Sequence, residues 1–273
     1  MMKIIFMVVI TLILFSLLIE RSKKESVISS ENKSSTYSTL KITLIYDNNE
    51  FDNRLRTAWG FSCLVETENE TILFDTGGDP ETLLENMEEL GIEPKKINKI
   101  LLSHIHGDHT GGLEGFLKVN HNVTVYLLKS FPEDFKEMIR GYGGKVIEIT
   151  GSKKISDGIY TTGELGIWIK EQSMFIETKK GIVVITGCAH PGIVNIVKRV
   201  EEISKKNVYL VLGGFHLISS SRAEIEDIAQ TLKEMGVKKV APCHCSGDEA
   251  RRIFKQLYGD DFILAGVGKI IVI

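Results

Sequence analysis

The chain has 273 residues, of which 43% are hydrophobic and 25% are charged, values that are ordinary for a globular protein. About 230 residues remain after an apolar N-terminal stretch, which is enough for one large domain or two small ones. The formal net charge of −3 gives the chain no basic excess. We therefore expect no nucleic-acid partner.

An apolar run at residues 4–19 is interrupted only by Thr11 and Ser16. The run is slightly short for a membrane span but can cross a bilayer that thins locally. The alternative is a cleaved signal peptide, but the following sequence ERSKK lacks the small-residue cleavage pattern that such a peptide needs. We therefore predict a membrane anchor at residues 1–25. The Lys and Arg residues that follow the run favour a cytoplasmic catalytic domain.

The four cysteines are Cys63, Cys188, Cys243 and Cys245, and their spacing fits no zinc-ribbon pattern. Cys243 and Cys245 flank His244 too closely to form an ordinary disulfide with each other. Free thiols are typical of a reducing compartment, which agrees with a cytoplasmic domain.

Residues 26–39 are rich in Ser and Thr and predict a flexible linker, so the folded domain is expected at residues 40–273. Pro80 begins a helical pattern that Gly91 ends. Alternating or continuously apolar segments predict the first strands, at residues 40–46, 61–66, 71–74 and 97–102.

The second half of the domain continues the alternation of strands and helices. Further strands are expected at residues 123–127, 145–149, 155–161, 165–170, 174–178, 182–186, 209–212 and 239–241. Helices are expected at residues 132–140, 193–204 and 222–235. Strands in long runs with helices between and after them predict an α/β (α+β) fold, in which helices cover the sheets.

The segment SHIHGDHTGG contains three imidazoles and a carboxylate within six residues. His104 and His106 occupy alternate positions at the end of an expected strand, so their side chains can face the same way. Gly107 lets the chain turn sharply, which can bring Asp108 and His109 to the same cavity. Imidazoles with a carboxylate suit zinc, iron or manganese better than calcium or magnesium. The chain has only seven histidines, so this segment predicts a metal site.

This H-x-H-x-D-H signature resembles that of the metallo-β-lactamase superfamily, and the DTG turn that begins at Asp75 matches an acidic turn of the same family. The resemblance covers residues 40–273. It implies a four-layer αββα sandwich, here preceded by the N-terminal apolar helix. It also implies two divalent metal ions in a cleft at the edge of the sheets, with zinc as the first choice and iron or manganese as alternatives.

Further segments resemble one branch of that superfamily. They are EQS at residues 171–173, TGCAHPGIVN at 186–195, GGFHL at 213–217 and HCSG at 244–247. The branch is named after 7,8-dihydropterin-6-yl-methyl-4-(β-D-ribofuranosyl)aminobenzene 5′-phosphate synthase, an enzyme assigned to methanopterin biosynthesis. The resemblance implies a transferase that joins a pterin methyl diphosphate to a ribosyl aminobenzene phosphate and releases diphosphate.

The resemblance also implies two ligand sets. His104 and His106 share one metal with a later histidine, for which His190 is our candidate. Asp108 and His109 share the other metal with a C-terminal histidine, which His244 matches because it follows an expected strand.

Two positions depart from the pattern of the family. TGC replaces T-G-D, so Cys188 is either a thiolate ligand or a small core residue. Glu171 and Gln172 stand where a G-H pair is usual. His216 lies in a Gly-rich turn after a strand. It could bind metal, contact the substrate or have no part in the site. Of these we expect substrate contact or proton transfer.

Asp108 is expected to combine metal binding with an acid/base role. Asp75 either orients a ligand histidine or caps its own turn. Ser246 and Gly247 precede an expected helix, whose free N–H groups suit a phosphate. Phe215, together with Trp59 and Phe61, either stacks on a flat substrate ring or packs in the core.

Two other functions are compatible with the same residues. A metallo-hydrolase such as a phosphodiesterase would use the same metal-bound water. A non-catalytic metal or redox module would keep the site without turnover. We expect two partners. One is a small phosphorylated substrate, for which a pterin is a candidate, and the other is the membrane.

Overall fold

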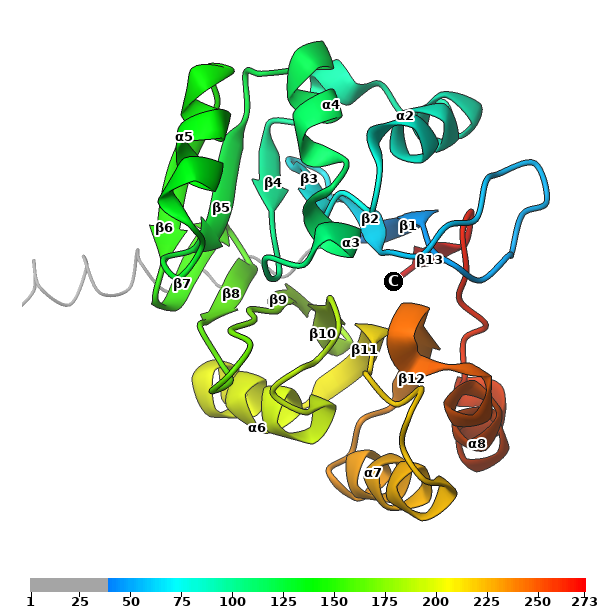
Figure 1. Cartoon of the computed structure of the whole chain (residues 1–273). Helices are drawn as coiled ribbons and strands as arrows, with labels where there is room; N and C mark the ends of the chain where they lie inside the picture. The colour runs from blue at the N-terminus through cyan, green and yellow to red at the C-terminus, as the bar shows by residue number, and fades with distance from the viewer. Residues whose placement is uncertain (1–38) are drawn as a thin grey trace, which may run out of the picture. The chain divides into compact units, whose positions relative to one another are not determined.

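The computed structural model describes residues 39–273 (Figure 1). The predicted anchor at residues 1–25 and the linker up to residue 38 lie outside the described residues. Within the described part, no helix is both long and apolar enough to cross a membrane.

The first sheet has seven strands in the order β13-β1-β2-β3-β4-β5-β6. Its strands are β1 (Lys41–Tyr46), β2 (Ser62–Glu66), β3 (Thr71–Phe74), β4 (Lys99–Leu101), β5 (Thr124–Leu128), β6 (Lys145–Ile149) and β13 (Ile270–Val272). The strands β3 to β6 run parallel, whereas β13, β1, β2 and β3 pair antiparallel. The parallel strands place their carboxyl ends at one edge of the sheet.

The second sheet has six strands in the order β12-β11-β10-β9-β8-β7. Its strands are β7 (Gly151–Ser156), β8 (Ile159–Gly163), β9 (Met174–Thr178), β10 (Gly181–Thr186), β11 (Val208–Gly214) and β12 (Lys239–Cys243). The strands β10, β11 and β12 run parallel, so their carboxyl ends also share an edge.

Helices cover the outer faces of both sheets (Figure 1). The first sheet carries α2 (Pro80–Glu89), α4 (Leu113–Val119) and α5 (Glu133–Gly141). The second sheet carries α6 (Ile193–Ser204), α7 (Arg222–Glu234) and α8 (Asp248–Tyr258). One buried apolar cluster includes residues from both sheets, and another packs α6, α7 and α8 onto the second sheet. The expected two-sheet αββα sandwich is confirmed for the described residues.

Local sequence signals explain where several helices begin. Asp79 caps α2 by accepting a hydrogen bond from the Thr82 N–H, and Pro80 occupies the first turn, where its missing N–H is not needed. Ser221 and Glu224 form a capping box at the start of α7. The remaining short helices are α3 (Gly107–Thr110) and the 3-10 turns Pro94–Lys96, His244–Ser246 and Gly259–Asp261.

Two of the expected strands are wrong. Residues 155–161 form no single strand, because the chain turns at Asp157 and Gly158 between β7 and β8. Residues 165–170 form an exposed loop, closed by an isolated bridge between Leu165 and Glu171. The apolar residues of this loop face solvent instead of a sheet neighbour.

Candidate metal centre

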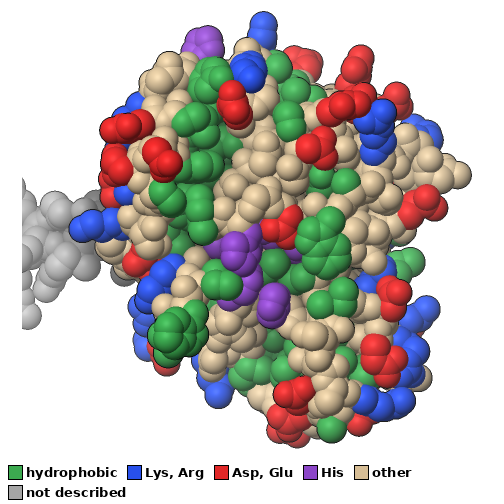
Figure 2. Space-filling model, in the orientation of Figure 1, with side chains coloured by type: hydrophobic (Ala, Val, Ile, Leu, Met, Phe, Trp, Pro, Cys, Tyr) green, Lys and Arg blue, Asp and Glu red, His purple; other side chains and the backbone are tan. Residues whose placement is uncertain are grey.

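The residues of the predicted site follow strands of both sheets. Asp75 follows β3 and His104 follows β4, while His190 follows β10 and His244 follows β12. The carboxyl ends of these strands therefore meet at one edge of the sandwich, where open α/β folds place their binding sites. Figure 2 shows histidines gathered in the middle of this face, with exposed hydrophobic side chains on both sides.

A first group of donors consists of His104, His106 and His190, whose ligand atoms lie within 4.8 Å of one another. The Nδ1 of His104 lies 2.9 Å from the Ser103 hydroxyl, and the Nδ1 of His190 lies 2.9 Å from a Glu171 oxygen. The Nε2 of His104 lies 3.1 Å from the Nδ1 of His106. His104 and His190 thus have one ring nitrogen held by oxygen and the other available to the group.

A second group consists of Asp108, His109, Cys188 and His244. The Nδ1 of His109 lies 2.7 Å from an Asp75 oxygen, and its Nε2 lies 3.2 Å from the Cys188 sulfur. The Nδ1 of His244 lies 3.0 Å from the Asn48 amide oxygen. The same arrangement therefore recurs: an oxygen fixes one ring nitrogen and the second nitrogen faces the other donors.

The donors fit divalent metal ions. The Nε2 of His244 is buried and has no hydrogen bond of proper geometry, although an Asp108 oxygen lies only 3.2 Å away. Burial, with the charge of His109, lowers the pKa of His104 to about 3. Burial, with the charge of His244, lowers the pKa of His109 to about 3. Both imidazoles are thus neutral at pH 7 and keep a lone pair for a metal.

Asp75 connects the two donor groups through its contacts with Ser103 and His109. One of its oxygens accepts hydrogen bonds from the Ser103 hydroxyl, at 2.7 Å, and contacts His109, and the other accepts from the Ser103 N–H at 2.6 Å. Burial raises the pKa of Asp75 to about 8. Gly187 permits this approach, because a Cβ there would lie 2.2 Å from the Ser103 hydroxyl.

Glu171 organises the loop that carries Cys188 and His190. One carboxylate oxygen accepts hydrogen bonds from the Thr186 hydroxyl and from the N–H groups of three successive residues, Gly187, Cys188 and Ala189. The other oxygen accepts from the His190 N–H and contacts its ring. Burial alone would raise the pKa of Glu171, but these hydrogen bonds and the nearby imidazoles hold it well below its usual range. The sequence analysis noted the EQS segment that begins at Glu171 but assigned this carboxylate no role.

Backbone strain is concentrated at the same place. Asp75, Ala189, His216 and His244 all have positive φ values, between 47° and 59°. Only a few per cent of residues other than glycine adopt this conformation, and they cluster at functional sites. The strain indicates that the surrounding packing fixes these side chains in position.

Two buried cysteines lie in contact beside the second group. The sulfur atoms of Cys188 and Cys245 are 3.3 Å apart. The hydrogen bond with Cys188, together with that of His216, lowers the pKa of Cys245 to about 5, whereas the pKa of Cys188 is raised. Cys245, which the sequence analysis assigned no role, therefore belongs to the surroundings of the site.

The residues that were expected to contact the substrate differ in whether they are buried or exposed. Phe215 is 1% exposed and packs against Phe254, so its side chain lies in the core and not in the cleft. Phe61 is buried in the same way. Ser246 is also buried, and its hydroxyl accepts the Phe215 N–H, which leaves that oxygen turned away from solvent.

Trp59 and Gly247 lie nearer the surface. Trp59 is 50% exposed, and its ring centre lies 4.9 Å from that of His244. Gly247 precedes α8 with a φ of 77°. His216 is exposed, and its ring centre lies 4.6 Å from that of His190. The structure thus brings Trp59 and His216 to the rim of the metal centre.

Comparison with known proteins agrees with this geometry. Residues 60–244 match the sequence model of the metallo-beta-lactamase superfamily. The 7,8-dihydropterin-6-methyl-4-(beta-D-ribofuranosyl)-aminobenzene-5'-phosphate synthase of Methanocaldococcus jannaschii is 33% identical over an alignment that covers 84% of this chain and 95% of that protein.

Solved structures show the same fold. Tm1679, described as a metal-dependent hydrolase of the beta-lactamase superfamily, gives a TM-score of 0.73 at 30% identity and covers 85% of this chain and 98% of its own. YhfI from Bacillus subtilis, a metallo-beta-lactamase fold protein, gives a TM-score of 0.66 at 18% identity and covers 86% of this chain and 99% of its own. From the family match and the identity to its relatives, the chain belongs to the metallo-β-lactamase superfamily.

Proposed function

We propose that this protein is a metal-dependent enzyme with a dinuclear centre that transfers a group between small phosphorylated substrates. The observation that carries the proposal is the pair of adjacent donor groups: the ring centres of His104, in the first group, and His109, in the second, are 4.2 Å apart. Donor groups this close could place two cations within reach of a single substrate.

Each donor group would hold one divalent ion, with zinc the fitting choice for imidazole, carboxylate and thiolate donors. Bound there, the ions would supply Lewis acidity toward phosphate oxygens and lower the pKa of bound water. In this proposal Asp108 is both a ligand and a proton acceptor, and Asp75 keeps the His109 ring in position. His216, at the rim, contacts the substrate or transfers a proton.

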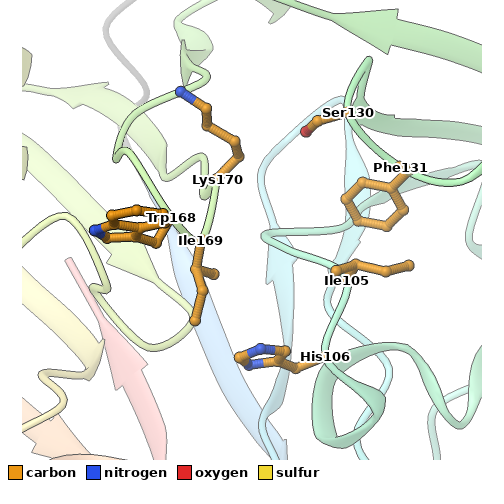
Figure 3. Close-up of a pocket in the computed structure, with 7 residues that line it drawn as sticks. All are labelled: Ile105, His106, Ser130, Phe131, Trp168, Ile169 and Lys170. Atoms are coloured by element: carbon orange, nitrogen blue, oxygen red, sulfur yellow. The ribbon is translucent and has the colours of Figure 1, made fainter.

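Two cavities beside the first donor group offer room for a substrate. One of about 160 Å³ is lined by His106, Trp168 and Lys170, among others, and another of about 330 Å³ is lined by Trp168, His190 and His216, among others. Figure 3 shows Trp168, Ile169 and Lys170 on one side of the first cavity and Ile105, Ser130 and Phe131 on the other, with His106 below them. An exposed indole suits a flat ring, and a lysine suits an anionic group.

The transferase assignment draws on the synthase relative, which is 33% identical over most of both chains. The proposed reaction joins a dihydropterin methyl diphosphate to a ribofuranosylaminobenzene phosphate. A C–N bond forms, the bond from the methyl carbon to the diphosphate oxygen breaks, and the amine proton passes to an enzyme base.

A metallo-hydrolase is the second candidate, because Tm1679 is described as a metal-dependent hydrolase and is 30% identical over 85% of this chain. In that reaction water would replace the amine as the nucleophile. The same metal centre could support group transfer and hydrolysis, so analysis of the products is needed to distinguish the two reactions.

The test is product analysis with the metal-loaded full chain and both phosphorylated substrates. A product with a new C–N bond, together with diphosphate, supports the transferase, whereas hydrolysed substrate alone supports the hydrolase and rejects the transferase. The His106→Ala and His244→Ala variants should lose turnover and bound metal together. Full metal occupancy in both variants would contradict the proposed ligands.

A further inference from the structure

A third group of donors lies beside the two that the proposed function uses. The ligand atoms of Cys188, His216 and Cys245 all lie within 4.8 Å of one another. Both cysteines are buried, with exposures of 4% and 3%, while His216 lies at the surface. A dinuclear centre with two ligand groups requires neither Cys245 nor His216.

The three residues occupy equivalent positions after three neighbouring strands. Cys188 stands two residues beyond the end of β10 at Thr186, and His216 two residues beyond the end of β11 at Gly214. Cys245 stands two residues beyond the end of β12, and these three strands are parallel neighbours. Each strand of the trio therefore contributes one donor from the same position at the same edge.

The backbone is shaped to let the donors approach one another. A Cβ on Gly214 would lie 2.6 Å from the Cys245 sulfur and 2.4 Å from the Gly187 carbonyl oxygen, so only glycine fits there. His216 adopts a left-handed conformation with a φ of 54°. Strain of this kind persists only where the surroundings require it.

The donor chemistry favours a soft divalent cation. Two cysteines and one histidine form a three-ligand set that binds zinc and leaves a fourth position open. The sulfur atoms of Cys188 and Cys245 lie 3.3 Å apart, so one cation could contact both. Because His216 is exposed, water or a substrate group could reach such an ion from the solvent.

We propose that Cys188, His216 and Cys245 bind a further zinc ion, in addition to the two ions of the dinuclear centre. Cys188 is shared with the second group, since its sulfur also lies 3.2 Å from the Nε2 of His109. Its thiolate would thus bridge the additional ion and the dinuclear centre. Binding displaces the protons of the two thiols, so each ion bound releases protons to the solvent.

The test is a zinc count and a cobalt(II) spectrum of the full chain, purified under reducing conditions and loaded with each metal. The Cys245→Ala variant should bind one ion per chain fewer than the parent and should show a weaker thiolate-to-cobalt charge-transfer band. Cys63→Ala is the matched control, because Cys63 is also fully buried but lies in β2, within the core between the sheets. It should keep the parent's metal count and spectrum.

His216→Asn provides a second variant in case Cys245→Ala does not fold. His216 is exposed, and asparagine tolerates the left-handed conformation. This variant should also lose one ion per chain and weaken the cobalt band. An unchanged zinc count and an unchanged spectrum in His216→Asn overturn the proposal. A parent protein that binds no more than two ions under reducing conditions also overturns it. Neither result bears on the reaction of the dinuclear centre.

Discussion

Glu171 carries a buried negative charge, and four of its six hydrogen-bond partners are backbone N–H groups of one loop. Its two oxygens accept hydrogen bonds from the loop that supplies Cys188 and His190. Hydrogen bonds to a charged group each contribute more than those between neutral groups, so this carboxylate fixes the loop more firmly than packing alone. Two candidate ligands therefore depend on a residue that touches neither proposed ion.

Replacing Glu171 with Gln removes the charge and turns one acceptor oxygen into a donor. We expect the free energy of unfolding to fall by about 2 kcal/mol and metal affinity to fall by about tenfold. Urea denaturation and competitive metal titration measure the two effects. Glu202→Gln is the control, because the Glu202 side chain is 65% exposed and pairs only with Arg199 in the described contacts. Equal stability and affinity in the two variants would show that Glu171 does not organise the loop.

We expect Asp75 to act through His109, and its substitution separates orientation from charge. Asp75→Asn keeps the size of the side chain but presents an amide N–H or a neutral oxygen to the His109 ring. We expect the affinity for metal at the second group to fall by about 10- to 100-fold. Titration with a chromophoric chelator would measure it. If affinity stays within about twofold of the parent, Asp75 serves its turn rather than the histidine.

At the scale of elements, the loop of residues 166–170 is the least sheltered part of the site. Ile167 is 84% exposed and Trp168 is 96% exposed, although large apolar side chains are usually covered in a monomeric protein. The loop lies between the two cavities that adjoin the metal centre. We infer that it provides the apolar wall of the substrate site.

Trp168→Ala tests this role with little risk to folding, because the side chain makes few contacts. We expect unchanged thermal stability and a weaker affinity for ring-containing substrates, by about 1–2 kcal/mol or roughly tenfold. The chain has only two tryptophans, so fluorescence quenching in Trp59→Phe reports binding at Trp168 directly. If the substrate does not quench the fluorescence of Trp59→Phe, it binds away from Trp168.

Most helices and strands were predictable, because the residues that mark each element lie within it or next to it in the sequence. The expected strands at residues 71–74 and 145–149 and the helix at 193–204 agree with the observed bounds of β3, β6 and α6. The strand expected at residues 165–170 was wrong because the continuous apolar run Ile167, Trp168 and Ile169 resembles a buried strand, although it pairs with no sheet. β13 was missed because three residues carry too weak a pattern, and the pairing with β1 decides their conformation.

The site was predictable where the donors are adjacent in sequence and less so where they are distant. The segment from His104 to His109 is a compact motif, and the superfamily resemblance supplied His190 and His244. Glu171 and Cys245 lie in segments that the resemblance marked, but they and Asn48 were assigned no role, because their partners are distant in the sequence. The repeated position two residues beyond β10, β11 and β12 is a signal that the strand ends, once placed, could have given for Cys245.

For the whole molecule, the metal centre lies between the two sheets' strand ends, so bound metal ties both halves of the sandwich together. Binding to the folded chain alone stabilises it by about 2.7 kcal/mol for each ion present at 100 times its dissociation constant. We expect a chelator to lower the urea midpoint of the metal-loaded protein by a corresponding amount. The double variant His106→Ala/His244→Ala should show a much smaller chelator effect. Equal midpoints with and without chelator in the parent protein would argue against this coupling.

The most direct measurement is an anomalous difference map, at the zinc edge, from a crystal of the zinc-loaded full chain. The two ligand groups predict one peak among His104, His106 and His190 and another among Asp108, His109 and His244. A map with no peak at either group, although zinc is present in the crystal, would contradict the account.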